Sequence, residues 1–319
     1  MPESNSLPAP SSSFPVKTAS TPGAALLTFA IVATSSLFFC SKAIFVKMAY
    51  RYDLDAVTVL ALRMAIALPF FLVGGLLNSR QNTRAAPLSG QDWTRLALLG
   101  FCGWYLSSVV NFMGLKYVSV SLERMILYTY PSIVVIGSVL FLGKPLRWKV
   151  VAAMLVSYLG IVIAYRAEVL TGDNSRTLLG SALIFASAVS YAIFVLLSGQ
   201  MVQRIGAIRF TSCVVGFSCV FVLLHFALTH PPGALLKLPG GAYGCGLLLA
   251  IAGTVIPSYL FGLGIKRAGA QAFAIIGMIG PLGTVVLAWV LLGETVNAMQ
   301  IMGLLLTLVG GVAVSLMKS

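Results

Sequence analysis

Long apolar runs, divided by short polar or charged breaks, make up most of the chain. A helix needs about 20 apolar residues to cross a membrane. Dividing the runs at charges, prolines and glycines predicts ten such helices, and the connections between them leave no room for a soluble domain. The predicted spans are residues 24–46, 55–77, 94–115, 119–141, 149–165, 178–199, 208–229, 242–265, 269–291 and 298–316. The pattern therefore predicts an all-α integral membrane protein.

The second half of the chain repeats the first at an offset of 150 residues, without a gap. Glycines, one proline and one lysine are among the repeated residues, and chance similarity between apolar segments does not account for them. The residues that recur 150 positions later are Leu98, Leu99, Gly103, Ser108, Gly114, Lys116, Ile126, Pro131, Val135, Leu142, Gly143, Leu155, Gly160 and Val162.

This offset predicts two five-helix repeats, over residues 22–166 and 177–317. Residues 1–21 are rich in serine and proline, which predicts a disordered tail. Because five is an odd number, the second repeat must enter the membrane inverted relative to the first. Inverted repeats of this kind are the usual basis of alternating access in transporters.

Composition and charge support a membrane location. Hydrophobic residues make up 59% of the 319 residues and charged residues only 9%. The net charge of +13 comes mainly from the ends of the apolar runs: 12 basic residues fall on one predicted side and 7 on the other, with Lys42 and Arg63 inside spans. Basic residues favour the cytoplasmic side, so both termini are expected there, in a bacterial inner membrane, and no nucleic-acid partner is implied.

The fourth predicted span and its repeat carry a family resemblance. The stretches SVSLERMILYTYPSIVVIGSVLFLGKPL and GAQAFAIIGMIGPLGTVVLAWVLLGET share a small or polar start, a central proline and a closing Leu-Gly. They resemble the EamA type of the drug/metabolite transporter superfamily, over residues 24–316. The resemblance implies ten helices in two inverted repeats and secondary transport. It departs from the family at Lys144, where a glutamate is usual; the second copy keeps Glu294.

Arg63 and Lys42 are the candidate substrate anchors. Arg63 lies about nine residues into the second span, or roughly 13 Å deep at 1.5 Å per residue. A charge at that depth normally faces a cavity or a partner. Arg63 is therefore either a group that meets a substrate carboxylate or a structural arginine bonded to helix carbonyls. Lys42, near the outer end of the first span, either lines the cavity or extends to the surface.

Glu123 and Arg124 open the fourth span and have no charged counterparts in the second copy, where Phe273 and Ala274 stand. A carboxylate partly withdrawn from water is suited to take up and release a proton during transport. The pair is therefore the candidate for proton coupling or gating. The alternative is an exposed pair at a helix start, where an acidic residue complements the helix dipole.

The prolines of spans four and nine, Pro131 and Pro281, are predicted to break hydrogen bonding near the middle of the membrane. Freed carbonyls are tolerated there where they line a cavity. Tyr128 and Tyr130 flank the first break, and Gly280 flanks the second, where it allows close approach of the backbone. Further candidates for substrate binding are Trp104, Tyr105, Asn111, Tyr191, Ser258 and Tyr259.

No enzyme signature is present, since the chain lacks a Gly-rich phosphate loop followed by Lys-Ser/Thr. Two histidines, His225 and His230, are too few for a metal site. No cofactor is therefore expected. Glycines in spans five and ten, among them Gly160 and Gly310, are of the kind that let helices pack closely, as in a homodimer or a scaffold face.

The function predicted is secondary active transport of a small polar metabolite, such as an amino acid or a related carboxylate. Export, with proton coupling through Glu123, is the leading interpretation. Uptake of a vitamin, nucleobase or nucleotide-like compound is the alternative, since tyrosines near Pro131 suit an aromatic ring. A non-transporting scaffold or lipid-handling protein is the alternative of a different class.

Overall fold

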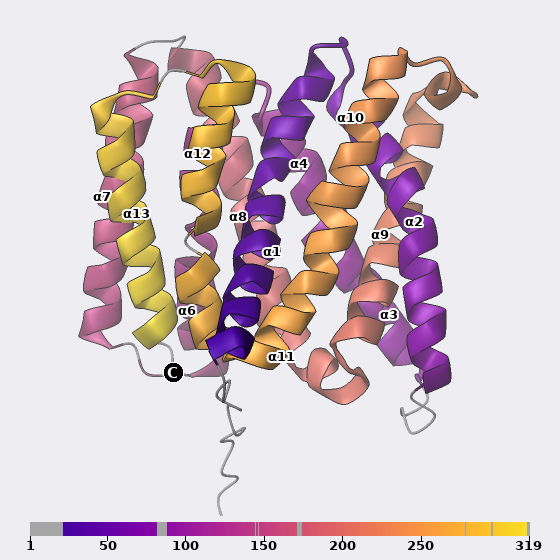
Figure 1. The fold of residues 1–319 in the computed structure, drawn as a ribbon, viewed down its shortest axis with the longest axis horizontal. Coiled ribbons are helices and arrows are strands. Elements are labelled where there is room, and N and C mark those ends of the chain that lie inside the picture. The colour runs from indigo at the N-terminus through magenta and orange to yellow at the C-terminus, as the bar shows by residue number, and fades with distance from the viewer. Residues whose placement is uncertain are drawn as a thin grey trace, which may run out of the picture.

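The computed structural model describes residues 22–81, 88–143, 145, 147–170, 174–277, 279–294 and 296–317, so the predicted tail and Lys144 lie outside the described residues. Helices make up almost all of the described chain (Figure 1). The α-helices are α1 (Pro22–Tyr50), α2 (Ala56–Gln81), α3 (Gly90–Gly100), α4 (Ser107–Gly114), α5 (Val120–Leu127), α6 (Tyr130–Leu142), α7 (Trp148–Val169), α8 (Asn174–Ile205), α9 (Ala207–Thr229), α10 (Gly240–Ala250), α11 (Ile256–Gly277), α12 (Ile279–Leu292) and α13 (Ala298–Met317).

Three short segments have other helical geometries: the π-helical turns η1 (Phe101–Leu106) and η3 (Ile251–Val255), and the 3₁₀ turn η2 (Ala234–Leu236). Each π-helical turn joins two α-helices without interrupting the rod, so that α3, η1 and α4 form one span. The first residues of η1 and η3 are 150 positions apart, which is the offset of the sequence repeat. Such π-helical turns occur mostly at functional sites.

Within the described residues, eight helical rods are long and apolar enough to cross a membrane, and α12 and part of α13 are shorter apolar helices. The chain is thus an all-α multi-pass membrane protein. In Figure 1 the helices stand side by side, α7 and α13 form one end of the bundle, and α2, α3 and α9 form the other.

One predicted boundary differs from the structure. Spans eight and nine were expected to separate between residues 265 and 269, but α11 continues through this stretch to Gly277. The stretch contains no proline, and none of its glycines is among those with a positive φ. Nothing there stops a helix, since neither common terminator is present.

The two central prolines lie just inside new helices. The α5 helix ends at Leu127 and α6 begins at Tyr130, so Pro131 occupies the first turn of α6. Likewise α12 begins at Ile279, two residues before Pro281. A proline in the first turn costs no hydrogen bond, because its missing N–H would have had no partner there.

The pair α7 and α13 packs more closely than side chains of ordinary size would allow. A Cβ on Gly160 would lie 2.5 Å from the Gly303 carbonyl oxygen, and one on Gly310 would lie 2.5 Å from the Ala153 carbonyl oxygen. The Ser157 hydroxyl donates to the Thr307 carbonyl at 3.3 Å. The predicted small-residue faces of spans five and ten are therefore used within the chain, against each other.

Substitution of Gly160 by alanine is expected to lower the melting temperature of the protein in detergent. The added methyl group would clash with backbone, which cannot move aside as a side chain can, and overpacking typically costs about 1–3 kcal/mol. Gly216→Ala is the matched control, because a Cβ on Gly216 in α9 would meet nothing within 4 Å. Equal melting temperatures for the two variants would contradict the close packing.

Candidate functional site

Arg63 is buried in the middle of the bundle and is only partly paired. Its side chain is 2% exposed, and its Nε donates to Thr254 Oγ1 at 2.7 Å. Thr254 lies in η3, and its hydroxyl also donates to the Leu249 carbonyl five residues earlier. The Nη1 atom of Arg63 is buried and has no hydrogen-bond partner among the described residues. Because an unpaired buried donor is costly, this atom is free to receive an acceptor from a ligand.

Lys42 turns inward to the same place and does not extend to the surface. Its ammonium lies 6.0 Å from the centre of the Phe112 ring, and the Arg63 guanidinium carbon lies 5.8 Å from the same ring. Lys42 is close enough to Arg63, Arg124 and Glu123 to interact with all three electrostatically. Among the described residues, no carboxylate oxygen lies within 4 Å of its ammonium. Two cations therefore share one aromatic ring.

Glu123 and Arg124 form a buried ion pair beside these cations. Arg124 Nε donates to Glu123 Oε2 at 2.6 Å, and its Nη2 donates to Oε1 at 3.0 Å. Asn111 Nδ2 donates to the same Oε1 at 2.9 Å, which leaves Asn111 Oδ1 buried without a partner. Both side chains of the pair are buried, Glu123 completely, so the exposed position at a helix start that the sequence left open does not occur.

We name Lys42, Arg63, Asn111, Glu123 and Arg124 the central charged cluster. Its members come from α1, α2, α4 and α5, and η3 contributes Thr254. Three of the five are cations and one is an anion. A structure would not retain this imbalance for stability alone, since unpaired buried charges are destabilising.

Aromatic side chains lie beside the cluster on one side. Tyr128 is close enough to Arg124 to interact electrostatically. The Tyr130 and Tyr191 rings pack edge to face, with their centres 5.2 Å apart. Trp104, which occupies in η1 the position that Thr254 occupies in η3, is partly buried against the core. These four side chains therefore extend the polar cluster into an aromatic region.

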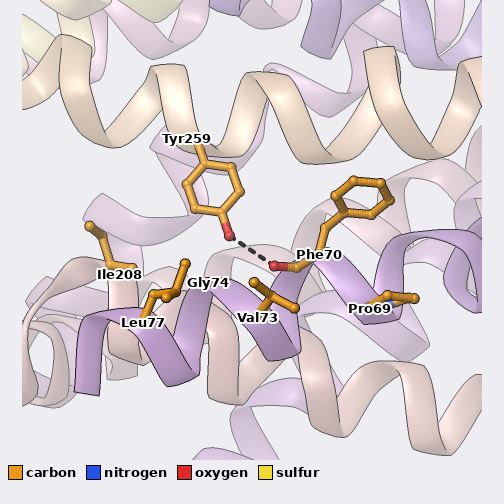
Figure 2. Close-up of a pocket in the computed structure, with 7 residues that line it drawn as sticks. All are labelled: Pro69, Phe70, Val73, Gly74, Leu77, Ile208 and Tyr259. Carbon is orange, nitrogen blue, oxygen red and sulfur yellow. Dashed lines mark hydrogen bonds between the residues drawn. The ribbon is translucent and has the colours of Figure 1, made fainter. Parts of the chain in front are cut away.

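The hydroxyl groups of three further predicted site residues, Tyr105, Ser258 and Tyr259, bond to partners that are not members of the central charged cluster. The Tyr105 hydroxyl lies 3.0 Å from His225 Nδ1. The Ser258 hydroxyl donates to the Thr254 carbonyl of its own helix at 2.6 Å. Tyr259 lines a groove of about 630 Å³, where its hydroxyl donates to the Phe70 carbonyl at 3.2 Å (Figure 2). The groove lining between α2 and α11 is apolar, as expected of a surface that faces lipid.

Gly280 brings α12 against α1 next to the cluster. A Cβ on Gly280 would lie 2.7 Å from Cys40 Sγ and 2.8 Å from the Ser36 carbonyl oxygen. Cys40 in turn interacts with Arg124 and Thr284. The absence of a side chain at Gly280 thus lets a helix of the second half of the chain reach the charged groups of the first half.

A second polar assembly holds the start of α5, and no pattern in the sequence predicted it. Glu294 accepts from the Val120 N–H through both carboxylate oxygens, at 3.0 and 3.1 Å, and pairs with Lys47 at 3.5 Å. Glu168 accepts from the backbone N–H and the hydroxyl of Ser119. We name these five residues the α5 cap. Two carboxylates at a helix N-terminus complement its partial positive charge.

At the same end of the bundle, Asp55 joins α2 to the end of α9. It caps α2 by accepting from the Val57 and Thr58 N–H groups at 2.7 and 3.1 Å, and its Oδ2 lies 2.9 Å from His230 Nε2. Partial burial acts to raise the pKa of Asp55, but the hydrogen bonds from Thr58, His230 and Val57 outweigh it and lower the pKa to about 2. The ionised form is therefore the one that the fold stabilises.

Replacing Asp55 by alanine is expected to lower stability at neutral pH by about 1 kcal/mol, the usual value of a lost N-cap. A carboxyl whose pKa is lowered by folding stabilises above its unfolded value, near 3.9, and loses this contribution as the pH falls toward 2. The difference between wild type and Asp55→Ala in thermal unfolding should therefore shrink below about pH 4. Asp55→Asn keeps the cap and separates it from the charge; a difference independent of pH would contradict the assignment.

The described residues contain no group of three or more His, Cys, Asp or Glu side chains that could hold a metal ion. The chemistry available at the central charged cluster is instead that of charge recognition. Arginine and lysine there can bind an anionic group, and Asn111 Oδ1 can accept from a hydroxyl or an N–H group. The arrangement fits binding of a small polar molecule.

Known transporters are similar to this chain over most of its length. The model of the EamA-like transporter family matches residues 26–166 and 178–316. The uncharacterized transporter YcbK of Bacillus subtilis is 30% identical over 271 residues, which cover 83% of this chain and 85% of YcbK. An uncharacterized transporter of Archaeoglobus fulgidus is 22% identical over 89% of this chain and 95% of its own.

One crystal structure resembles the fold with a TM-score of 0.63 and 17% sequence identity, over 91% of this chain and 98% of the other. At that identity the likeness concerns the fold alone. The family match covers most of the chain, and relatives that carry the name transporter extend over the same region. The chain belongs to the EamA-like transporter family.

Proposed function

We propose that the protein is a secondary active transporter that exports a small polar metabolite bearing a carboxylate across a bacterial inner membrane. The central charged cluster carries this proposal. Its cations lie within the bundle, Arg63 Nη1 and Asn111 Oδ1 have no hydrogen-bond partners in the part of the chain that the structure describes, and helices from both halves of the chain meet there. Intramembrane charges of this kind mark substrate or ion pathways.

The transport cycle would follow from two inverted five-helix repeats with both termini in the cytoplasm. Two observations support the inversion of one repeat relative to the other. Positions 160 and 303 are in contact, as are 153 and 310, so α7 and α13 run in opposite directions although their sequences correspond. The two π-helical turns also recur at the repeat offset. Exchange of the two repeats' conformations would turn the cluster from one side of the membrane to the other.

Glu123 is the group proposed to couple transport to protons. It is the one carboxylate of the cluster and is fully buried, and it is held by Arg124 and Asn111. Protonation of Glu123 would weaken the two hydrogen bonds that it accepts from Arg124. The Arg124 guanidinium would then be released toward substrate. Proton binding and substrate binding would then be linked through one side chain.

Glu123→Gln is expected to uncouple transport in proteoliposomes from an imposed pH gradient, because glutamine cannot take up the proton. Substrate exchange between equal compartments, which needs no driving force, should persist. The variant preserves the Asn111 contact, so its melting temperature serves to show that it is folded. A gradient dependence equal to that of the wild type would refute the role of Glu123.

Saturable flux of a carboxylate into or out of proteoliposomes tests the function itself. Saturable flux of a vitamin or nucleobase in its place would favour the alternative of uptake, for which the edge-to-face pair of Tyr130 and Tyr191 supplies an aromatic surface. Absence of saturable flux for every compound would favour a scaffold or lipid-handling protein.

A further inference from the structure

We infer that the central charged cluster is built for a small dianion, that is, a compound with two negative charges such as a dicarboxylate or a phosphate monoester. The inference rests on the proposed function and narrows its substrate class. The first observation is the charge balance. Lys42, Arg63 and Arg124 contribute three formal positive charges against the single formal negative charge of Glu123, which leaves two in excess.

The single carboxylate of the cluster is already engaged. Both oxygens of Glu123 accept from Arg124, and Oε1 also accepts from Asn111. Glu123 and Arg124 therefore neutralise each other, and the excess charge belongs to Lys42 and Arg63. The ammonium group of a zwitterionic amino acid would add a third unpaired cation without meeting a free carboxylate.

Arg63 and Lys42 are positively charged side chains without an anionic partner among the described residues. Arg63 is 2% exposed, and its Nη1 points to no acceptor. Lys42 lacks a carboxylate within 4 Å among the described residues, although it is partly buried and lies within the spanning helix α1. Buried charges normally come with partners. A bound anion on each of the two would supply the missing partners.

The Phe112 ring limits how far apart the two anionic groups can be. Lys42 Nζ and Arg63 Cζ lie 6.0 and 5.8 Å from its centre, so their separation cannot exceed the sum of these distances. Charge-assisted hydrogen bonds take up about 2.7–2.9 Å at each end. Two acidic groups joined by a short spacer, or one phosphate, are of a length that bridges two cations within this limit. Asn111 Oδ1 is available for a hydroxyl or N–H of the same molecule.

Thermal unfolding of the full-length protein in an uncharged detergent tests the inference with matched probes. Succinate carries two carboxylates and succinamate one, with almost the same shape; glycerol 3-phosphate and glycerol form the corresponding phosphate pair. We expect the dianions to raise the melting temperature at concentrations at least about tenfold lower than their partners require, because each charged hydrogen bond contributes about 1.5–3 kcal/mol. The two pairs show whether carboxylate or phosphate is preferred.

Lys42→Gln and Arg63→Gln should each reduce the preference for succinate over succinamate by about tenfold. The exposed Lys149 and Arg95 provide the controls Lys149→Gln and Arg95→Gln. Stabilisation by succinamate or by zwitterionic aspartate equal to that by succinate would overturn the inference, as would no response to any dianion. The comparison of the probes on the wild-type protein does not depend on the folding of any variant. Flux measured separately distinguishes failure of the dianion inference from failure of the proposed transport function. Transport of a neutral or zwitterionic compound would leave the proposed function intact.

Discussion

Arg63→Gln is expected to reduce transport by about tenfold or more while leaving the melting temperature unchanged or higher. The Nη1 atom of Arg63 is buried and has no hydrogen-bond partner among the described residues. Removal of the guanidinium should therefore cost at least one charged contact with substrate. At about 1.5–3 kcal/mol, that is a loss of roughly tenfold to more than a hundredfold in kcat/KM. Stability should not fall in parallel, because the variant no longer buries an incompletely paired charge beside Lys42.

Initial rates of flux in proteoliposomes and thermal unfolding of the same preparations measure the two effects. Arg95→Gln is the control, since Arg95 is an exposed arginine in the middle of α3. If Arg63 were only structural, Arg63→Gln would lower the melting temperature and the flux together. Thr254→Val gives an independent check: it removes the acceptor of Arg63 Nε, and it should weaken transport less than Arg63→Gln, because the cation itself remains.

Features that depend on local chemistry could be predicted from the sequence. The ends of most spans follow from hydropathy, and the helix starts at Pro131 and near Pro281 follow from a ring that fixes φ and removes an N–H group. The position between residues 265 and 269 shows the limit of this reasoning. The loop predicted there was inferred from charged residues and a glycine. Neither feature ends a helix by itself, and α11 is helical on both sides of this stretch.

The partners of the charged groups could not be predicted in the same way. Arg63 was recognised from its depth, but Thr254 lies 191 positions away and is brought to it by packing. One signal was present: Thr254 stands 150 positions after Trp104, which had been selected for its place in span three. Lys42 could have extended to the surface, and only the approach of Phe112 shows that it turns inward.

Glu294 was the clearest omission. Its position at the end of a span indicated a surface residue, and the sequence cannot show that the N-terminus of α5 lies within its reach. The α5 helix connects the α5 cap to the central charged cluster. Its start is bound by Glu294 and Glu168, and its next turn carries Glu123 and Arg124 of the central charged cluster. A movement of the chain after α12 would therefore reach the cluster through eight residues of α5.

Glu294→Gln is expected to open the face of the bundle at which α5 begins. Glutamine retains one acceptor for the Val120 N–H but removes the negative charge that meets Lys47 and the helix N-terminus. If this costs the closed state about 1.4 kcal/mol, near the lower limit for a charged hydrogen bond, the ratio of open to closed molecules rises about tenfold. Spin labels at Leu170 and Leu236, in a background without the native cysteines, would report a longer distance.

The second repeat offers no helix start of the same kind. Lys144 occupies in the first copy the position that Glu294 occupies in the second, and an ammonium group cannot accept from a backbone N–H. Ala270 corresponds to Val120, but it lies inside α11 and not at the start of a helix. The α5 cap therefore has no counterpart by sequence at the opposite face, which favours a resting state closed at the α5 cap. Asp53→Asn, an exposed acidic residue beside α1, is the control. Unchanged distances in Glu294→Gln would show that the cap is a static brace and not part of a gate.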